Sequence, residues 1–461
     1  MDYDVVVIGA GPAGEVAAGR LADGGLSVAV IERELVGGEC SYWGCMPSKT
    51  LIRPGDALAA ARRVPGAAAA VTGEVDVDAA FAWRDRITSS WDDSGAVPWL
   101  TDKGIELIRG TGRLAGERTV TVTVDDGGEH TLTAGRAVVL ATGTSAVIPP
   151  IPGLDSVDAW DNRRATAAHE VPERLLVLGG GAVGLELAQA FRRLGSGTVT
   201  IVEGSPRLLA REEPFAGDEV RAAFEAEAIA VHTSAKVTAA RRADDGSVTL
   251  ELEGGATLTG DELLVATGRR PATGDLGLDH VGLQPGESVE VDDRMRAHAV
   301  DGGWLYAVGD CNGRSLLTHM GKYQARIAAD VILGKDASAL GDPKAAPRVT
   351  FTDPQVCAVG LTEQAAIDAG HDVRTVRHAT GGVAGGSVLA DELPGTSQLV
   401  IDAERDVLLG ATFVGSGTQE LLHAATVAIT AEVPLDTLWH AVPAFPTLSE
   451  VWLRLLEATG R

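Results

Sequence analysis

Cys40 and Cys45 are separated by four residues in the stretch from Gly37 to Lys49, which reads GGECSYWGCMPSK. Pro47 suits the first position of a helix, and the residues from Lys49 to about Arg63 predict that helix. Free N–H groups and the positive end of the helix dipole would favour a thiolate at Cys45. The spacing therefore indicates a redox-active pair, although two buried thiols that never pair are compatible with the same residues.

A glycine-rich turn between two apolar runs precedes the cysteines. Val5 to Ile8 is followed by Gly9, Gly11 and Gly14, then by an alanine-rich helix and a second apolar run that ends at Glu32. Gly9 allows a tight turn, Gly11 lets a pyrophosphate approach the backbone, and Gly14 lets helix and strand close up. Glu32 can accept a hydrogen bond from a ribose hydroxyl, so the segment predicts a dinucleotide site.

The same pattern recurs more than a hundred residues later. Gly179, Gly181 and Gly184 follow an apolar run, and the next run ends before Glu203. Two complete fingerprints on one chain indicate two nucleotides held by one protein. The charge of Glu203 would repel a 2′-phosphate and favours NADH, whereas Arg207 could compensate and admit NADPH.

Two further motifs end apolar runs. Ala141-Thr142-Gly143 follows the first, and Ala266-Thr267-Gly268-Arg269 repeats it after the second. Asp310 follows the apolar run Trp304 to Val308, where a carboxylate could hold the polar chain of a cofactor or cap the next helix.

The composition excludes several classes of protein. With 64 acidic and 39 basic residues among 461, the formal net charge is −25, which argues against nucleic acid or an anionic membrane as a partner. The acidic start predicts no signal peptide, and no apolar run reaches spanning length. Four cysteines, two of them in one motif, favour a catalytic pair in a reducing cytoplasm over a disulfide scaffold.

The order of elements predicts an α/β protein with two Rossmann-like dinucleotide-binding domains and a C-terminal α+β domain. We expect a first nucleotide domain at 1–150 with a return segment at 273–345, a second at 151–272 and an interface domain at 346–461. A helix is predicted from Asp78 to Leu100, with core tryptophans at 83, 91 and 99, and a turn at Asp125 to Gly128.

Over nearly its full length, this order of motifs resembles the FAD-dependent pyridine nucleotide-disulfide oxidoreductases. The resemblance implies that Gly9, Gly11, Gly14, Glu32 and Asp310 hold FAD, and that Gly179, Gly181, Gly184 and Glu203 hold NADH or NADPH. Further cofactor-binding residues would be Gly38, Thr142, Gly143, Gly268 and Arg269. Cys45 would face the flavin, Cys40 would face the substrate, and Lys49 would pair with Glu186 beside the nicotinamide.

The chain also departs from this family. Members that reduce disulfides carry a histidine-proline pair near the C-terminus with a glutamate after it. Here Phe445 stands in the histidine position and Glu450 remains. His440 is the alternative acid, but its offset of five residues favours a structural histidine. Loss of a general acid typically removes a factor of about 100 to 10,000 in rate. Mercuric reductases share an aromatic residue at this position, but the C-terminal cysteine pair of those enzymes is not in this sequence.

The redox stretch departs as well. Glu39 stands where threonine is common, and it brings a negative charge near the expected FAD phosphates, for which the sequence offers no account. Tyr42 and Trp43 replace smaller residues, and we expect them to pack in the core rather than narrow a substrate opening.

These observations predict a homodimeric enzyme that passes hydride from NAD(P)H through flavin to a Cys40–Cys45 disulfide. The final acceptor would need no protonated histidine and could be a metal ion, a quinone or an unusual disulfide, and no resident metal site is expected. Two alternatives stay open: a quinone reductase or oxidase that uses the flavin alone, and a non-catalytic redox sensor.

Overall fold

The computed structural model describes residues 1–124 and 127–461, so Asp125 and Asp126 of the predicted turn lie outside the described residues. The chain forms two compact units. Unit 1 comprises Met1–Pro47, Asp85–Ala146 and Arg269–Pro343, and unit 2 comprises Ser48–Arg84, Val147–Gly268 and Lys344–Arg461. The domain boundaries proposed above stay predictions.

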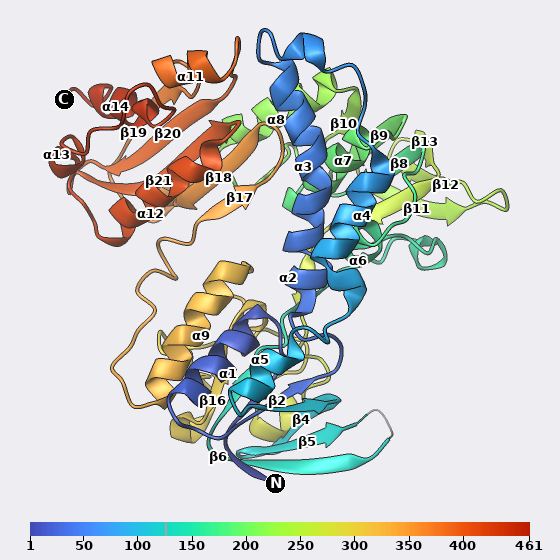
Figure 1. Cartoon of the computed structure of the whole chain (residues 1–461), viewed down its shortest axis with the longest axis vertical. Coiled ribbons are helices and arrows are strands. Elements are labelled where there is room, and N and C mark those ends of the chain that lie inside the picture. Colours follow the sequence, from blue (N-terminus) through green and yellow to red (C-terminus); the bar gives the residue numbers. More distant parts are fainter. Residues whose placement is uncertain (125–126) are drawn as a thin grey trace. The chain divides into compact units, whose positions relative to one another are not determined.

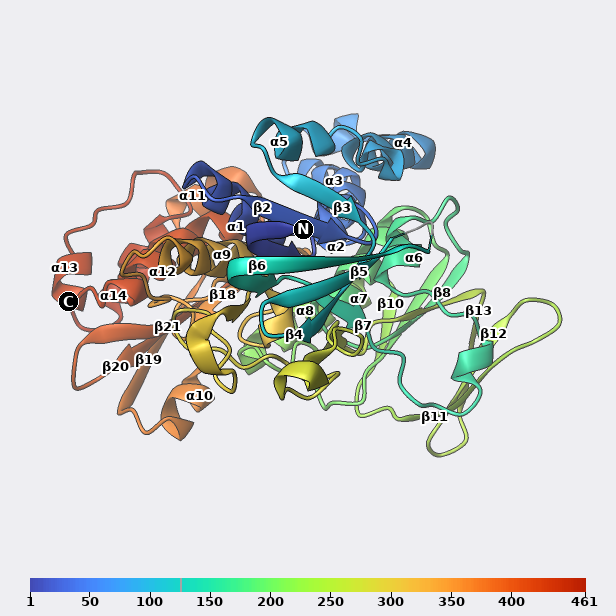
Figure 2. The same ribbon diagram turned by 90° about the horizontal axis from the view of Figure 1, so that it is seen from below.

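Unit 1 is built on a seven-stranded sheet in the order β3-β2-β1-β6-β5-β4, with β16 beside β6. The strands are β1 (Asp2–Ile8), β2 (Val28–Glu32), β3 (Glu106–Arg109), β4 (Thr111–Gly116), β5 (Thr119–Thr123), β6 (Glu129–Leu140) and β16 (Leu305–Ala307). Strands β1, β2, β3 and β16 run parallel to their neighbours, and β4, β5 and β6 form an antiparallel ribbon. Figure 2 shows the long strand β6 extending beside β4 and β5.

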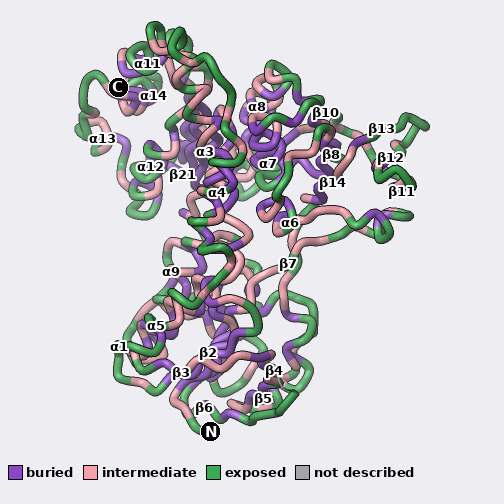
Figure 3. Tube along the Cα trace, turned by 45° about the vertical axis from the view of Figure 1, so that its right-hand side comes forward, coloured by how far each residue is buried: buried purple, intermediate pink, exposed green. Residues whose placement is uncertain are grey.

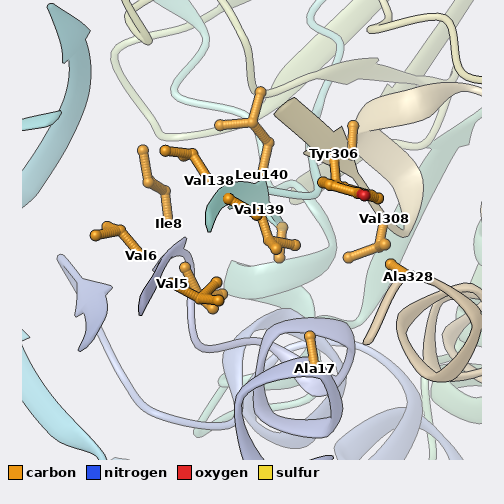
Figure 4. Close-up of a cluster of buried hydrophobic side chains, with 14 of the residues drawn as sticks. Val5, Val6, Ile8, Ala17, Val138, Val139, Leu140, Tyr306, Val308 and Ala328 are labelled. Carbon is orange, nitrogen blue, oxygen red and sulfur yellow. The ribbon is translucent and has the colours of Figure 1, made fainter. Parts of the chain in front are cut away.

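The core of unit 1 lies between this sheet and a pair of helices, α1 (Pro12–Asp23) and α9 (Thr318–Ile332). The valines and isoleucine of β1 are almost fully buried because both faces of a parallel sheet are covered. In Figure 4, Val5 points toward the helix that carries Ala17, and Val139 lies on the neighbouring strand, where it pairs with Val7.

The helices after the cysteine motif differ from the prediction. Helix α3 runs from Cys45 to Arg62, and the segment expected to be one helix from 78 to 100 divides into α4 (Val77–Ile87), a short turn at Ser89–Trp91 and α5 (Val97–Asp102). All three residues of that turn have φ near +50°, a left-handed conformation that ends α4. The expectation of three core tryptophans is wrong for Trp99, which is 43% exposed.

Unit 2 contains the second nucleotide fold, a parallel sheet in the order β10-β9-β8-β14. Its strands are β8 (Arg174–Leu178), β9 (Thr198–Val202), β10 (Ile229–His232) and β14 (Glu262–Val265), and its helices are α6 (Asn162–Thr166), α7 (Ala182–Arg193) and α8 (Pro214–Ala226). A three-stranded antiparallel sheet of β11 (Val237–Arg242), β12 (Val248–Leu252) and β13 (Thr257–Gly260) adjoins it in the chain. Figure 3 shows α7 and β8 largely in the colour of buried residues.

The C-terminal part of unit 2 is a five-stranded antiparallel sheet in the order β17-β18-β21-β20-β19. The strands are β17 (Arg348–Thr350), β18 (Gln355–Gly360), β19 (Val373–Ala379), β20 (Thr396–Asp402) and β21 (Val407–Gly415). Helix α12 (Leu422–Thr430) covers one face of β18 and β21 (Figure 1), and α14 (Glu450–Glu457) packs on β19 and β20. The remaining helices here are α10 (Glu363–Asp368), α11 (Ala384–Leu389) and α13 (Leu435–Leu438).

This architecture confirms the predicted fold class of two Rossmann-like regions and a C-terminal α+β domain. Among the described residues, none of the helices combines the length and the apolar character needed to cross a membrane.

A buried cluster of charges joins the parts of unit 2. The guanidinium of Arg193, at the end of α7, contacts carboxylates of Asp56, Glu227 and Asp353 at 2.9, 2.6 and 2.9 Å. Arg63 also pairs with Asp353 and donates to the hydroxyl of Ser416. Arg193 and Arg63 thus face three carboxylates, which leaves negative charge in excess in this cluster.

Burial and the charge of Asp353 raise the pKa of the Asp56 carboxyl to about 6, although Arg193 opposes the shift. The folded protein therefore holds this proton more tightly than the unfolded chain, and stability falls as pH rises through about 4 to 6. Asp56→Asn cannot titrate. Relative to wild type, its free energy of unfolding should rise by about 1 kcal/mol between pH 5 and pH 7.5, measured by urea unfolding. An identical pH dependence in both proteins would contradict this assignment.

Candidate redox and nucleotide-binding sites

The cysteine pair lies where two helices meet in sequence. Cys40 is in α2 (Gly38–Tyr42), and Cys45 is the first residue of α3. The helix thus begins four residues earlier than predicted, and Pro47 is its third residue rather than its first. Proline is tolerated there because the N–H groups of a first helical turn have no partner within the helix. Both cysteines are free thiols and half-buried.

The structure brings the two thiols into contact. A hydrogen bond with Cys45 and, next, burial raise the pKa of the Cys40 thiol. The sulfur of Cys45 lies 3.3 Å from the hydroxyl oxygen of Thr318, the first residue of α9. The arrangement is that of a dithiol able to close to a disulfide, with polar groups beside both sulfurs.

The first nucleotide turn is shaped by close backbone contacts. An added Cβ at Gly9, where φ is +102°, would lie 2.5 Å from the carbonyl oxygen of Ala141, and one at Gly14 would lie 1.9 Å from the oxygen of Gly9. A Cβ at Gly11, by contrast, would meet nothing within 4 Å. The backbone ahead of α1 is therefore open to a ligand, and a diphosphate fits the free N–H groups of that helix start.

The carboxylate of Glu32 closes this turn. It accepts hydrogen bonds from the N–H groups of Ala10 at 2.6 Å and Glu34 at 2.8 Å, and its side chain is buried. Burial raises the pKa of the Glu32 carboxyl, and the two N–H groups oppose that shift. The redox stretch packs against the same turn at Gly38, where φ is +57°. An added Cβ at Gly38 would lie 2.8 Å from the Cα of Gly11.

The second turn repeats this construction in unit 2. An added Cβ at Gly179 would lie 2.4 Å from the carbonyl oxygen of Ala266, one at Gly184 would lie 2.3 Å from the oxygen of Gly179, and the space beside Gly181 is open. Glu203 accepts from the N–H groups of Gly180 and Ser205, each at 2.6 Å. Both turns therefore fit a dinucleotide in the same way.

The two Ala-Thr-Gly motifs lie against the two nucleotide turns. In each unit the alanine carbonyl packs on the first glycine of the fingerprint, which explains why the motif occurs twice. Thr142 and Gly143 follow Ala141 directly, and Gly268 follows Ala266 by two residues. A Cβ at either glycine would meet nothing within 4 Å, so both positions have room for a ligand.

Among the described residues, no hydrogen bond joins Arg207 to Glu203. The Arg207 guanidinium instead donates to the carbonyl of Ala210 at 2.7 Å. The carboxylate of Glu203, which directly follows the second nucleotide strand, thus lies next to the open turn without a described contact to Arg207.

Asp310 accepts a hydrogen bond from the hydroxyl of Thr144 at 2.8 Å. Burial raises the pKa of the Asp310 carboxyl, while the Thr144 hydrogen bond and the charge of Arg269 oppose the rise. Asp310 does not cap the following long helix, because α9 starts after Leu317 and its first turn has no side-chain cap.

Lys49 and Glu186 are brought together within unit 2. Their side chains form an ion pair of 2.6 Å, and the Glu186 carboxylate also accepts from the N–H of Phe351 at 2.9 Å. The Lys49 ammonium lies 4.9 Å from the centre of the Phe351 ring. Sequence reasoning missed Phe351, which no motif marks.

Phe445 is 77% exposed and carries no group that can transfer a proton. Glu450, at the start of α14, is buried and accepts from the N–H of Gly385 at 3.1 Å. His440 is exposed. The expected place of Phe445 and Glu450 at the histidine and glutamate positions of the family stays a prediction.

Two further contacts in unit 1 were not anticipated. The indole of Trp91, in the left-handed turn, donates to the carbonyl of Tyr42 at 3.0 Å and so supports the end of α2. Tyr42 is buried, as expected, and its ring lies 5.7 Å from that of Trp43. A serine-rich segment offers no sequence signal for either the turn or this contact.

Comparisons with known proteins agree with this geometry. Residues 3–326 match the pyridine nucleotide-disulphide oxidoreductase family, and residues 346–455 match the dimerisation domain of that family. A dihydrolipoyl dehydrogenase from Chlorobaculum tepidum is 36% identical over 455 residues, which cover 97% of this chain and 95% of that protein. A mercuric reductase from Streptomyces lividans is 35% identical over 457 residues, which cover 95% of this chain and 93% of that protein.

Solved structures give the same result. The HOCl-induced flavoprotein disulfide reductase RclA from Escherichia coli, solved as a Cu(II) complex, has a TM-score of 0.87 and 26% identity, and the match covers 99% of each chain. LpdA from Mycobacterium tuberculosis has a TM-score of 0.86 at the same identity, covering 98% of this chain and 99% of that one. The chain described here therefore belongs to the pyridine nucleotide-disulphide oxidoreductase family, whose members are NAD(P)H-dependent flavoproteins.

Proposed function

We propose that this enzyme passes electrons from NADH through FAD and the Cys40–Cys45 pair to an acceptor that needs no protonated histidine, with a thiophilic metal ion as the first candidate. The proposal rests on Phe445, an exposed aromatic side chain that the sequence resemblance places where disulfide-reducing members of the family carry a histidine. A leaving thiolate requires a proton, whereas a metal ion that accepts electrons does not.

The residues of unit 1 fit FAD. The open backbone at Gly11, the carboxylates of Glu32 and Asp310, and the space beside Gly143 would hold its diphosphate and sugar chain. When bound, FAD supplies a two-electron acceptor for hydride that can pass its electrons on to a disulfide. In unit 2, the turn at Gly181 and the acid Glu203 would hold the nicotinamide dinucleotide.

The protein's own thiols complete the transfer. Two electrons and one proton convert the Cys40–Cys45 disulfide to a thiol and a thiolate; a hydrogen bond with Cys45 and burial raise the pKa of the Cys40 thiol. Two electrons leaving for one Hg(II), or for two Cu(II) that each become Cu(I), re-form the S–S bond and release that proton to water. Among the described residues, no three or more histidine, cysteine, aspartate or glutamate side chains are grouped so that they could hold a metal ion.

Lys49 and Glu186 would be positioning residues beside the nicotinamide. The ammonium is fixed by the 2.6 Å ion pair, and the carboxylate is held in turn by the N–H of Phe351. A cation held this way favours negative charge on a neighbouring reduced ring system.

The likeness to named relatives supports a metal acceptor and a dimer. One relative is a mercuric reductase, and the RclA structure is a copper complex. The match to a dimerisation domain supports a homodimer, in which Phe445 and Glu450 would face the partner's redox pair. A reducing cytoplasm would keep the thiols available for turnover.

A panel of acceptors tests this proposal. With NADH as donor, Hg(II) or Cu(II) should be reduced faster than lipoamide, glutathione disulfide or a benzoquinone. Cys40→Ser should lower metal reduction by more than about 100-fold because one of the two sulfurs that exchange electrons is lost. Quinone reduction of equal rate in wild type and Cys40→Ser, with no metal reduction in wild type, would instead establish the flavin-only reaction.

Phe445→His should raise the rate with small disulfides, because it restores a proton donor, by up to about 100-fold. Phe445→Leu is the matched control, since it removes the ring without adding an acid. The measurement is kcat for wild type and both variants, with lipoamide as the substrate that is reduced and, in the reverse direction, with its dithiol form as the substrate that is oxidised. An unchanged rate in Phe445→His, or wild-type disulfide turnover that already equals metal turnover, would show that position 445 does not decide the acceptor.

Glu203 should determine the preference for NADH. Glu203→Gln keeps an oxygen that can accept from the N–H of either Gly180 or Ser205, which now donate to different carboxylate oxygens, and it removes the charge that repels a 2′-phosphate. The ratio of kcat/KM for NADH to that for NADPH should fall by about tenfold. Arg207→Met is the control and should leave the ratio unchanged, because Arg207 binds the Ala210 carbonyl. A wild type that prefers NADPH would overturn this part of the proposal.

A further inference from the structure

Glu39 places a carboxylate in the redox stretch, directly before Cys40. It pairs with the guanidinium of Arg269 at 3.2 Å, and the two side chains are only 26% and 21% exposed. Half-buried charges are stable when they are paired and hydrogen-bonded. The contact therefore joins α2 to a residue 230 positions away in the chain.

Arg269 continues this connection. It begins strand β15 (Arg269–Pro271), which pairs in antiparallel register with β7 (Thr144–Ala146). Its Nε donates to the hydroxyl of Thr144 at 2.8 Å, and its Nη2 donates to the Thr144 carbonyl at 2.9 Å. The planar guanidinium thus contacts Thr144 at two points and Glu39 at a third, which fixes its orientation.

The direction of the next hydrogen bond follows from these partners. Arginine can only donate, so the Thr144 hydroxyl accepts from Arg269 and has its single proton left for another group. That proton goes to Asp310, whose carboxylate oxygen lies 2.8 Å away. A continuous path of charge-assisted hydrogen bonds therefore runs from Glu39 to Asp310, entirely within unit 1.

We propose that Glu39 is a positioning residue for the flavin: through Arg269 and Thr144 it orients Asp310 and holds the helix that carries Cys40 in register with it. The inference rests on the proposed role of Asp310 in binding FAD. It also accounts for a negative charge close to the expected FAD phosphates, because the charge is used to hold Arg269 rather than to face the ligand.

The test is FAD affinity of the apoprotein, measured by flavin fluorescence. Glu39→Ala should raise the Kd about tenfold, the size expected for one charge-assisted hydrogen bond. Glu39→Gln should give a Kd between those of wild type and Glu39→Ala, because its amide oxygen accepts from Arg269 but carries no charge. In a Thr144→Val background, which breaks the path, Glu39→Ala should change the Kd by less than about twofold.

Glu117→Ala is the matched control, since Glu117 is an exposed acid of unit 1, with a side chain that is 68% exposed. A wild-type apoprotein that fails to bind FAD would overturn the proposed function itself. A wild type that binds FAD while Glu39→Ala binds equally well or more tightly would overturn only the positioning role. Thermal unfolding of the apoproteins adds a second readout. If Glu39→Ala lowers the Tm but leaves the Kd for FAD unchanged, the positioning role of Glu39 is overturned.

Discussion

The contact between two thiols is the interaction on which the rest of this protein's chemistry depends. Cys40 and Cys45 belong to different helices, and the hydrogen bond between them exists only because α2 ends and α3 begins within a few residues. Two thiols in contact can store two electrons and release them by closing to a disulfide, while either thiol alone cannot. The supports of α2, from Trp91 at its end and Glu39 within it, therefore act on the redox pair.

A second constraint is shared by both nucleotide turns. In each, a carbonyl oxygen from an alanine packs against an α-carbon at a distance that excludes any side chain, while the next glycine of the fingerprint opens to free space. The protein thus uses the same local solution twice, in separate units, for two ligands of similar shape. The terminal acids differ in burial, since Glu32 is buried and Glu203 is half-exposed, although both bind two backbone N–H groups.

Local patterns predicted much of this from sequence. The glycine spacing, the apolar runs and the Ala-Thr-Gly repeats depend on neighbours within a single βαβ unit, so the parallel sheets and their turns were predictable. The start of α3 was wrong by one turn because Pro47 is acceptable anywhere in the first turn, not only at its first residue. The break between α4 and α5 could not be predicted, because the left-handed residues Ser89–Trp91 include no glycine that would indicate such a conformation.

Long-range contacts were the part that sequence could not supply. Glu39 looked unexplained because its partner Arg269 lies far along the chain, and Phe351 carries no motif although its N–H binds Glu186. Such pairs follow from the packing of strands that only the fold brings together.

The central claim is that the cysteine pair, and not the flavin alone, receives electrons from the nicotinamide. An anaerobic titration of the FAD-loaded enzyme with NADH, followed by absorbance and by counting of free thiols, tests it most directly. The account predicts that in wild type the first equivalent of NADH yields two thiols and a long-wavelength thiolate-to-flavin band, and that a second equivalent reduces the flavin and removes the band, while Cys40→Ser takes up one equivalent only. Uptake of a single equivalent by both proteins, with no new thiols in wild type, would contradict it.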